Sequence, residues 1–246
     1  MKTKTPSFAY KTIEERLLSD ENIFLSIYLI DSYIESKELL SLEDKQTLLK
    51  LNDIFDINNI KETIKKVKNR LIKIIKKDDY FEVTVYFKPK KYKEEVEFRP
   101  IHTASLIDQI AMVAMLQVLV YDVDINGKLT LSDLSRLLPI EFYGNKIACN
   151  VKELFKPWYE QYSEYSSKAN ELLNIYCETL EYKYEVNLDL EKFFPSINPK
   201  ILYSFIMDQL PQKLNDDDKK TMKIIVKKLL FFKIKDIYKN NNEVKW

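Results

Sequence analysis

The chain has 246 residues, of which 46% are hydrophobic, and its 39 basic residues nearly balance 38 acidic ones. This length and composition allow one large or two small globular domains, and the near-neutral charge does not by itself indicate a polyanionic partner. With only two glycines and one histidine, the chain lacks the residues for a glycine-rich phosphate loop or a two-histidine zinc motif.

Nothing in the sequence predicts a membrane or secreted protein. No apolar run approaches the roughly 20 residues that span a bilayer, and the first ten residues lack the apolar core of a secretion signal. We therefore expect a cytoplasmic protein with no membrane partner. The two cysteines, Cys149 and Cys177, are too few for a disulfide framework, and we expect both to be buried, reduced thiols.

The first eighty residues are predicted to form a helical N-terminal region, because apolar residues recur at helical spacing over 12–19, 21–36 and 43–51. The clearest case is 60–77. Its apolar positions are Ile60, Ile64, Val67, Leu71 and Ile75. The remaining positions carry seven lysines and Arg70, which gives a basic outer face. Two interpretations of this face stay open, a solvated surface and a surface that contacts phosphate groups.

The period then changes from 3.6 to 2, which predicts a β-hairpin. Apolar and polar residues alternate over 81–88 and again over 94–99, and the turn-like PKKYK at 89–93 would form a lysine-rich tip. His102 is expected in a turn after the hairpin. Residues 106–121 are apolar on nearly all sides and predict a helix that is buried in the core.

The second half of the chain is predicted to mix helices with one strand. A short helix is expected near 131–137, and 151–180 should be helical in at least its second half. Residues 182–190 alternate apolar and polar side chains, which is typical of a strand. Helices are predicted through 202–210 and over 217–232.

Two details concern those last helices. Asn198 and Pro199 suit the N-cap and the first position of the first helix. Asp216, Asp217 and Asp218 are expected in a polar turn before the second helix.

A calcium loop is one alternative for the middle of the chain. Asp122, Asp124 and Asn126 occupy alternate positions before Gly127, as the oxygen ligands and the sharp bend of such a loop require. Against it, the twelfth position carries aspartate in place of the bidentate glutamate, and no second loop exists to pair with it. A calcium-responsive interaction module that uses residues 122–133 is therefore a rival hypothesis.

The segment LDLEKFFPSI at 188–197 carries the clearest chemistry. The end of a strand can hold Asp189 rigidly enough to bind Mg²⁺, and the backbone carbonyl of Leu190 can join it as a ligand. An aromatic side chain after the bend, Phe194, can pack beneath a bound sugar. For this segment alone, a packing corner is an equal alternative.

This segment closely resembles motif A of reverse transcriptases, in the form found in group II intron and bacterial retroelement enzymes. The resemblance implies that Asp189 is a catalytic metal ligand, that Leu190 offers its carbonyl, and that Phe194 is the steric gate against a ribose 2′-hydroxyl. The complete reaction would then join a deoxynucleotide to a primer with Mg²⁺ as cofactor. An RNA template, a nucleic-acid primer and dNTP are the implied partners.

Two further segments resemble the same family. EFRPIHTASLIDQIAMVAML at 97–116 is similar to its fingers signature, which implies that Arg99 contacts the triphosphate and that Lys91 or Lys93 adds a second positive charge. A surface ion pair with a neighbouring glutamate is the alternative for Arg99. FYGNK resembles the element between fingers and palm. By that resemblance the residues that approach template or primer are Tyr143, Gly144 and Asn145.

In combination, the three segments look most like a defence-associated, abortive-infection type of bacterial reverse transcriptase. The expected fold is α+β, with a helical N-terminal region at 1–80, fingers at 81–180 and the beginning of a palm at 181–246. A [YF]-x-D-D tetrapeptide does not occur in the sequence, so we expect this chain to be inactive by itself. A catalytically inactive nucleic-acid-binding relative is the second hypothesis, and a homo-oligomer through the N-terminal helices is a further expectation.

Overall fold

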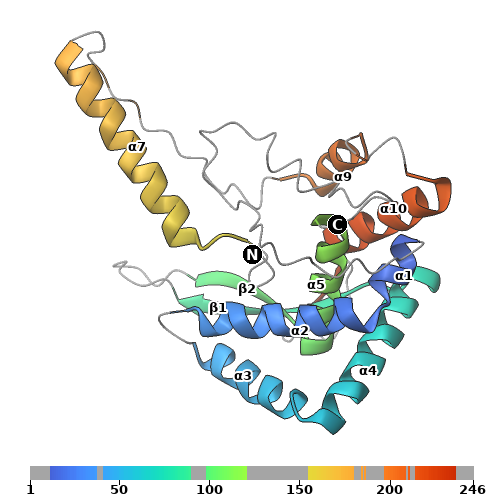
Figure 1. The fold of residues 1–246 in the computed structure, drawn as a ribbon. Coiled ribbons are helices and arrows are strands. Elements are labelled where there is room, and N and C mark those ends of the chain that lie inside the picture. Colours follow the sequence, from blue (N-terminus) through green and yellow to red (C-terminus); the bar gives the residue numbers. More distant parts are fainter. Residues whose placement is uncertain are drawn as a thin grey trace, which may run out of the picture.

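The computed structural model describes residues 12–37, 41–89, 98–120, 155–179, 184, 186, 197–208, 210 and 214–236. The fold is mixed α+β and mostly helical, with one small sheet of three strands in the order β2-β1-β3 (Figure 1). This confirms the α+β part of the expected fold class. None of the helices in the described ranges is long and apolar enough to cross a membrane.

The N-terminal region is helical, as predicted. Its helices are α1 (Ile13–Leu17), α2 (Asp20–Glu35), α3 (Leu42–Ile54) and α4 (Ile57–Lys76). Polar residues at the N-caps fix where they begin. Ser19 accepts a hydrogen bond from Asn22 N at the start of α2, and Ser41 forms a reciprocal capping box with Asp44 at the start of α3.

The predicted hairpin is present, and its second strand continues past the predicted end at Arg99. The strand β1 (Glu82–Pro89) pairs antiparallel with β2 (Phe98–Ala104), and the register runs from Val83↔Ala104 to Pro89↔Phe98. His102 therefore lies inside β2 opposite Val85, and the prediction that it occupies a turn is wrong.

A third strand, which the sequence analysis did not predict, completes the sheet. This strand, β3 (Lys233–Asp236), pairs parallel with β1 across about 150 residues of chain, and Phe81 O accepts a hydrogen bond from Lys233 N at 2.8 Å. Four residues are too few for a periodic pattern to stand out. Pairing with β1 is what makes them a strand.

The helices of the second half follow the prediction closely. They are α5 (Leu106–Val120), α7 (Trp158–Thr179), α9 (Pro199–Asp208) and α10 (Asp216–Leu230). Asn198 caps α9 as expected, because its Oδ1 accepts a hydrogen bond from Lys200 N at 2.9 Å. The three aspartates at 216–218 form the first turn of α10, so their predicted place in a preceding turn is wrong. Asp218 is buried there and accepts a hydrogen bond from Ile13 N at 2.8 Å.

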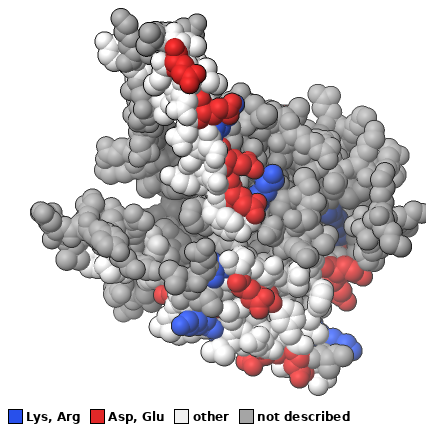
Figure 2. Space-filling view, turned by 60° about the vertical axis from the view of Figure 1, so that its left-hand side comes forward, with Lys and Arg blue, Asp and Glu red and all other residues white. Residues whose placement is uncertain are grey.

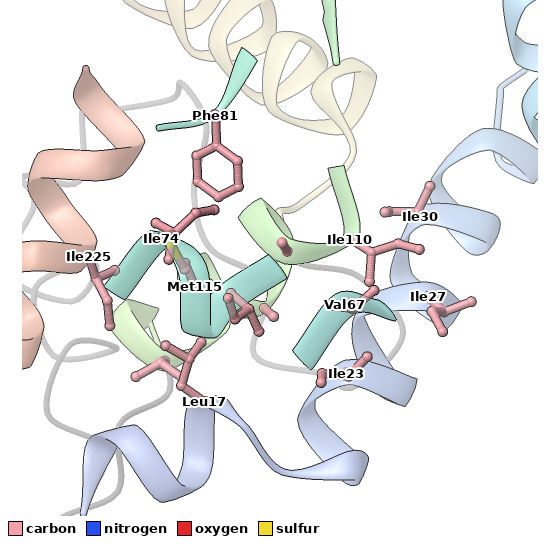
Figure 3. Packing of buried hydrophobic residues seen from close by; sticks show 14 of the residues in the cluster. Leu17, Ile23, Ile27, Ile30, Val67, Ile74, Phe81, Ile110, Met115 and Ile225 are labelled. Atoms are coloured by element: carbon pink, nitrogen blue, oxygen red, sulfur yellow. The ribbon is translucent and has the colours of Figure 1, made fainter. Parts of the chain in front are cut away.

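The core lies where α1, α2, α4, α5 and α10 meet the base of β1 (Figure 3). Its fully buried members include Leu17, Ile23, Ile27, Val67, Leu71, Ile74, Phe81, Ile110, Met115 and Ile225. As predicted, α5 is the central helix: it is apolar all round and contacts α1, α2, α4 and α10.

Two predictions fail outside this core. Tyr184 and Val186 fall within the predicted strand at 182–190, yet neither lies in a strand, and their side chains are 88% and 75% exposed. The rest of that segment, like the helix expected at 131–137, lies outside the described residues. Cys177 is exposed on α7, so the expectation of a buried thiol is wrong for it.

Candidate functional site at the hairpin

The β1–β2 hairpin carries Arg99, the one predicted site residue whose backbone falls in the described ranges. The register pairs Arg99 with Lys88. Residues directly opposite each other in an antiparallel pair share one face of the sheet, so two basic residues occupy one level of the hairpin. Like charges at such positions repel unless an anion or an acidic group lies near them. This level is next to the connection that contains Lys91 and Lys93.

The hairpin is anchored at one end and exposed at the other. At its base, Phe81 and Val83 are buried in the core. Toward the connection, Phe87 and Phe98 are 54% and 55% exposed, and Phe87 lies opposite Pro100 on the face that does not hold Arg99. At this end the register therefore puts two basic positions on one side of the sheet and the exposed rings of Phe87 and Phe98 on the other. Basic and aromatic groups are the two kinds that nucleotides bind.

A partly buried ion cluster around Arg70 holds the base of this hairpin. Its Nε donates to Asp108 Oδ1 at 2.6 Å, its Nη1 to Asp79 Oδ2 at 2.5 Å, and its Nη2 to the carbonyl of Tyr80 at 2.8 Å. Burial lowers the pKa of the Arg70 guanidinium, but hydrogen bonds and charge from Asp108 and Asp79 outweigh it and raise that pKa. The cation therefore joins α4, α5 and the residues that lead into β1.

A second cation contacts the same segment from α10. The side chain of Lys228 is only 1% exposed, and its Nζ lies 2.5 Å from Asp78 Oδ1 and 3.4 Å from the centroid of the Tyr80 ring. Asp78 adopts a left-handed backbone conformation (φ 50°), which aspartate tolerates better than most residues. The hydrogen bond from Lys228 lowers the pKa of Asp78. Residues 78–80 are thus fixed by α4, α5 and α10 together.

A neutral polar network aligns α2 with α5. Asn22 Nδ2 donates to the carbonyl of Ala114 at 3.2 Å, and Gln117 Nε2 donates to Ser26 Oγ at 2.5 Å. All three side chains are buried. Because their hydrogen bonds join the two helices to each other, we interpret this network as structural support.

The basic face of α4 is partly used inside the molecule. Lys68 pairs with Asp20 of α2, and Lys76 Nζ lies 2.7 Å from Glu14 Oε1 of α1. Arg70, which the sequence analysis assigned to the outer face, belongs to the ion cluster, so that assignment is wrong. These contacts favour the structural interpretation for part of the face, and the phosphate interpretation stays open for the exposed lysines.

The other predicted site residues lie outside the described residues. They are Lys91, Lys93, Tyr143, Gly144, Asn145, Asp189, Leu190 and Phe194, together with the calcium loop at 122–133. The roles predicted for them stay predictions. Within the part of the chain that the structure describes, no three His, Cys, Asp or Glu residues are grouped so as to hold a metal ion.

Sequence analysis missed three residues that position the hairpin: Arg70, Asp108 and Lys228. Weak signals existed for two of them. Arg70 is the one arginine in a helix otherwise rich in lysine, and Asp108 is the one charged residue of an apolar helix. Lys228 gave no signal, because it stands in a lysine-rich helix whose other lysines look the same in sequence. Lys88 was missed because its partner depends on the register between the two strands.

Comparison with known proteins gives no assignment: no protein-family model matches the sequence, and no curated protein is significantly similar to it.

Proposed function

We propose that the chain is the N-terminal part of an RNA-directed DNA polymerase that adds deoxynucleotides to a primer by two-metal phosphoryl transfer in antiphage defence. The hairpin would be the fingers element that receives the triphosphate. The single observation that supports this is the pairing of Lys88 with Arg99, next to the connection that carries Lys91 and Lys93. Four basic residues on one short hairpin are well suited to phosphate oxygens.

Three features of the sequence agree with this proposal. The hairpin is followed directly by a buried helix, α5, in the order expected from the resemblance of residues 97–116. FYGNK and the Asp189 segment then follow in the family's order. An aspartate and a backbone carbonyl, as proposed for Asp189 and Leu190, are the oxygen ligands that Mg²⁺ prefers.

In the proposed reaction the residues of this chain bind and orient. Arg99, Lys88 and a lysine of the connection would hold the triphosphate, while Phe194 would exclude a ribose 2′-hydroxyl. Mg²⁺, when bound, would stabilise the charge that develops as pyrophosphate leaves. Tyr143, Gly144 and Asn145 would approach the template or primer. The Arg70 cluster would keep the hairpin at a fixed angle to α5.

Primer extension by the full-length protein tests the catalytic role. We expect Asp189→Ala to reduce deoxynucleotide incorporation to background. The matched control is Asp217→Ala, which removes an exposed aspartate in the first turn of α10 and should leave incorporation unchanged. Undiminished incorporation by Asp189→Ala would exclude this aspartate as a metal ligand.

A second measurement separates the enzyme from an inactive nucleic-acid-binding relative. Lys88→Ala and Arg99→Ala should each raise the KM for dNTP roughly tenfold or more, since each removes a charge-assisted contact. The affinity for a primer–template duplex should change less. Lys50→Ala, which removes an exposed lysine of α3, is the control. Weaker duplex binding with no dNTP-dependent signal in any variant would favour the binding-only relative.

A further inference from the structure

The helix α7 is a long amphipathic helix that extends away from the sheet and the core helices (Figure 1). It has 22 residues, which corresponds to a length of roughly 33 Å. Its apolar stripe follows steps of three and four residues. The members of this stripe are Tyr162, Tyr165, Ala169, Leu172 and Tyr176. This alternation is the heptad spacing of residues that face a partner helix in a coiled coil.

Much of this stripe is exposed. Tyr162 is 63% exposed, Tyr165 52%, and Leu172 and Tyr176 more than a third each. The rings of Tyr162 and Tyr165 lie 6.3 Å apart, so they form one continuous surface. Exposed apolar surface that is concentrated on one side of a helix marks an interaction site.

The charges of α7 lie away from the stripe. Its glutamates are Glu160, Glu164, Glu171 and Glu178. At heptad spacing they fall on positions that a partner helix does not contact, and Figure 2 shows acidic side chains along this helix. Of the positions that flank the stripe, Lys168 alone is charged, and its Nζ is already 2.8 Å from Glu171 Oε1 of the same helix. The positions that flank the stripe therefore bring few charges close to a second copy of α7.

The stripe is also complementary to itself when its direction is reversed. In an antiparallel pair of α7 helices, Tyr162 would face Leu172 of the other copy, and Tyr165 would face Ala169. Each contact then matches a large ring with a smaller side chain, as interdigitated packing requires. A parallel pair would instead place Tyr162 against Tyr162 and leave Ala169 facing alanine.

From the spacing, the exposure, the outward charges and this complementarity, we infer that α7 is a self-association surface. It pairs with α7 of a second copy of this chain in an antiparallel coiled coil. This interface differs from the N-terminal helices, and it does not depend on the proposed polymerase activity.

Molecular mass in solution tests the interface. Light scattering or sedimentation of the 246-residue chain over a concentration series should give a dimer. The double variant Tyr162→Glu/Leu172→Glu should raise the dimer dissociation constant roughly tenfold or more, because it places charges in the apolar seam. The control, Ser167→Glu/Asn174→Glu, adds the same charge on the exposed side away from the seam and should remain dimeric. Circular dichroism should give the same helix content for both variants.

Three outcomes overturn the proposal. The chain could stay monomeric at the highest soluble concentration. Both double variants could dimerise as the original chain does, which would move the interface to another surface such as the N-terminal helices. Both could be equally weakened, which would mean a general charge effect.

Cross-linking tests the orientation of the pair. In a background with Cys149→Ser and Cys177→Ser, an antiparallel pair brings residue 166 of both copies to the same flank. A short bismaleimide should therefore cross-link Ser166→Cys efficiently and its outward neighbour Ser167→Cys poorly. Ala169→Cys should form no disulfide between copies, since its partner would be residue 165. A rapid disulfide through Ala169→Cys would contradict the antiparallel arrangement.

Discussion

The helices α4 and α7 have similar lengths, and both carry apolar residues at steps of three and four, but the apolar stripe of α4 is buried and that of α7 is exposed. On α4, Val67, Leu71 and Ile74 are fully buried against the core. On α7, Tyr162 and Leu172 remain exposed. Amphipathicity therefore predicts which face of a helix is apolar. Whether the same molecule covers that face depends on which elements pack beside it.

What distinguishes α4 is a set of charged contacts around its apolar stripe. Arg70 binds Asp108 of α5 and the carbonyl of Tyr80, and Lys76 pairs with Glu14 of α1. A partly buried ion pair such as Arg70–Asp108 fixes the position of two helices more than it adds stability, because the cost of desolvation offsets much of the attraction. The glutamates of α7 lie on the side away from its apolar stripe, and Lys168 pairs with Glu171 of the same helix.

Removing the charge of Arg70 should have the largest effect. Arg70→Met leaves Asp108 buried without its charged partner, and we expect the free energy of unfolding to fall by about 3–5 kcal/mol. Urea unfolding, monitored by circular dichroism, measures this free energy of unfolding. The control is Lys73→Met on the exposed side of the same helix, for which we expect a change within about 0.5 kcal/mol. Equal effects of both variants would mean that the ion cluster does not hold α4 in place.

Truncating one leucine in each helix tests the comparison most directly. Leu71→Ala should cost about 2–5 kcal/mol, because it opens a cavity among fully buried side chains. Leu172→Ala on α7 should cost less than about 1 kcal/mol when measured at concentrations where the chain is monomeric. Similar losses for the two variants would show that α7 is covered to the same extent as α4.

A helix cap provides a smaller effect. Ser41→Ala removes both the hydrogen bond to Asp44 N and the hydroxyl that contacts the Asp44 carboxylate, and should cost about 1 kcal/mol. The comparison is Ser167→Ala in the middle of α7, which should change stability by less than about 0.5 kcal/mol. Thermal unfolding of the two variants side by side provides the test.

Lowering the pH should weaken the anchoring of α4, because the Asp79 carboxylate that binds Arg70 becomes protonated. Burial raises the pKa of Asp79, but hydrogen bonds from Tyr80 N and Arg70, with the Arg70 charge, outweigh it and lower that pKa. The resulting stability is fully present above the unfolded pKa of about 3.9 and is lost as the pH falls through the lower folded pKa. Asp79→Asn should therefore flatten part of the acid limb of a stability–pH curve. An unchanged slope would mean that Asp79 does not contribute.

Structural features that depend on a few neighbouring residues could be predicted from the sequence. Helical periodicity gave α2, α3, α4, α5 and α10 to within a few residues, and Asn198 was correctly identified as a cap. The alternation of apolar and polar residues predicted the hairpin. The same local reasoning ended its second strand at Arg99, whereas the pairing with β1 continues through Ala104.

The sequence by itself determined the mixed helical and strand composition, the apolar faces of its helices and the residues that could bind phosphate. Tertiary structure alone decided that Arg70 joins an ion cluster, that Lys228 is buried, that Lys233–Asp236 is a strand, and that Lys88 lies opposite Arg99. The physical reason is distance along the chain. Helix periodicity and caps depend on residues three or four positions apart, whereas these features depend on partners 11 to about 150 positions away, which no local pattern records.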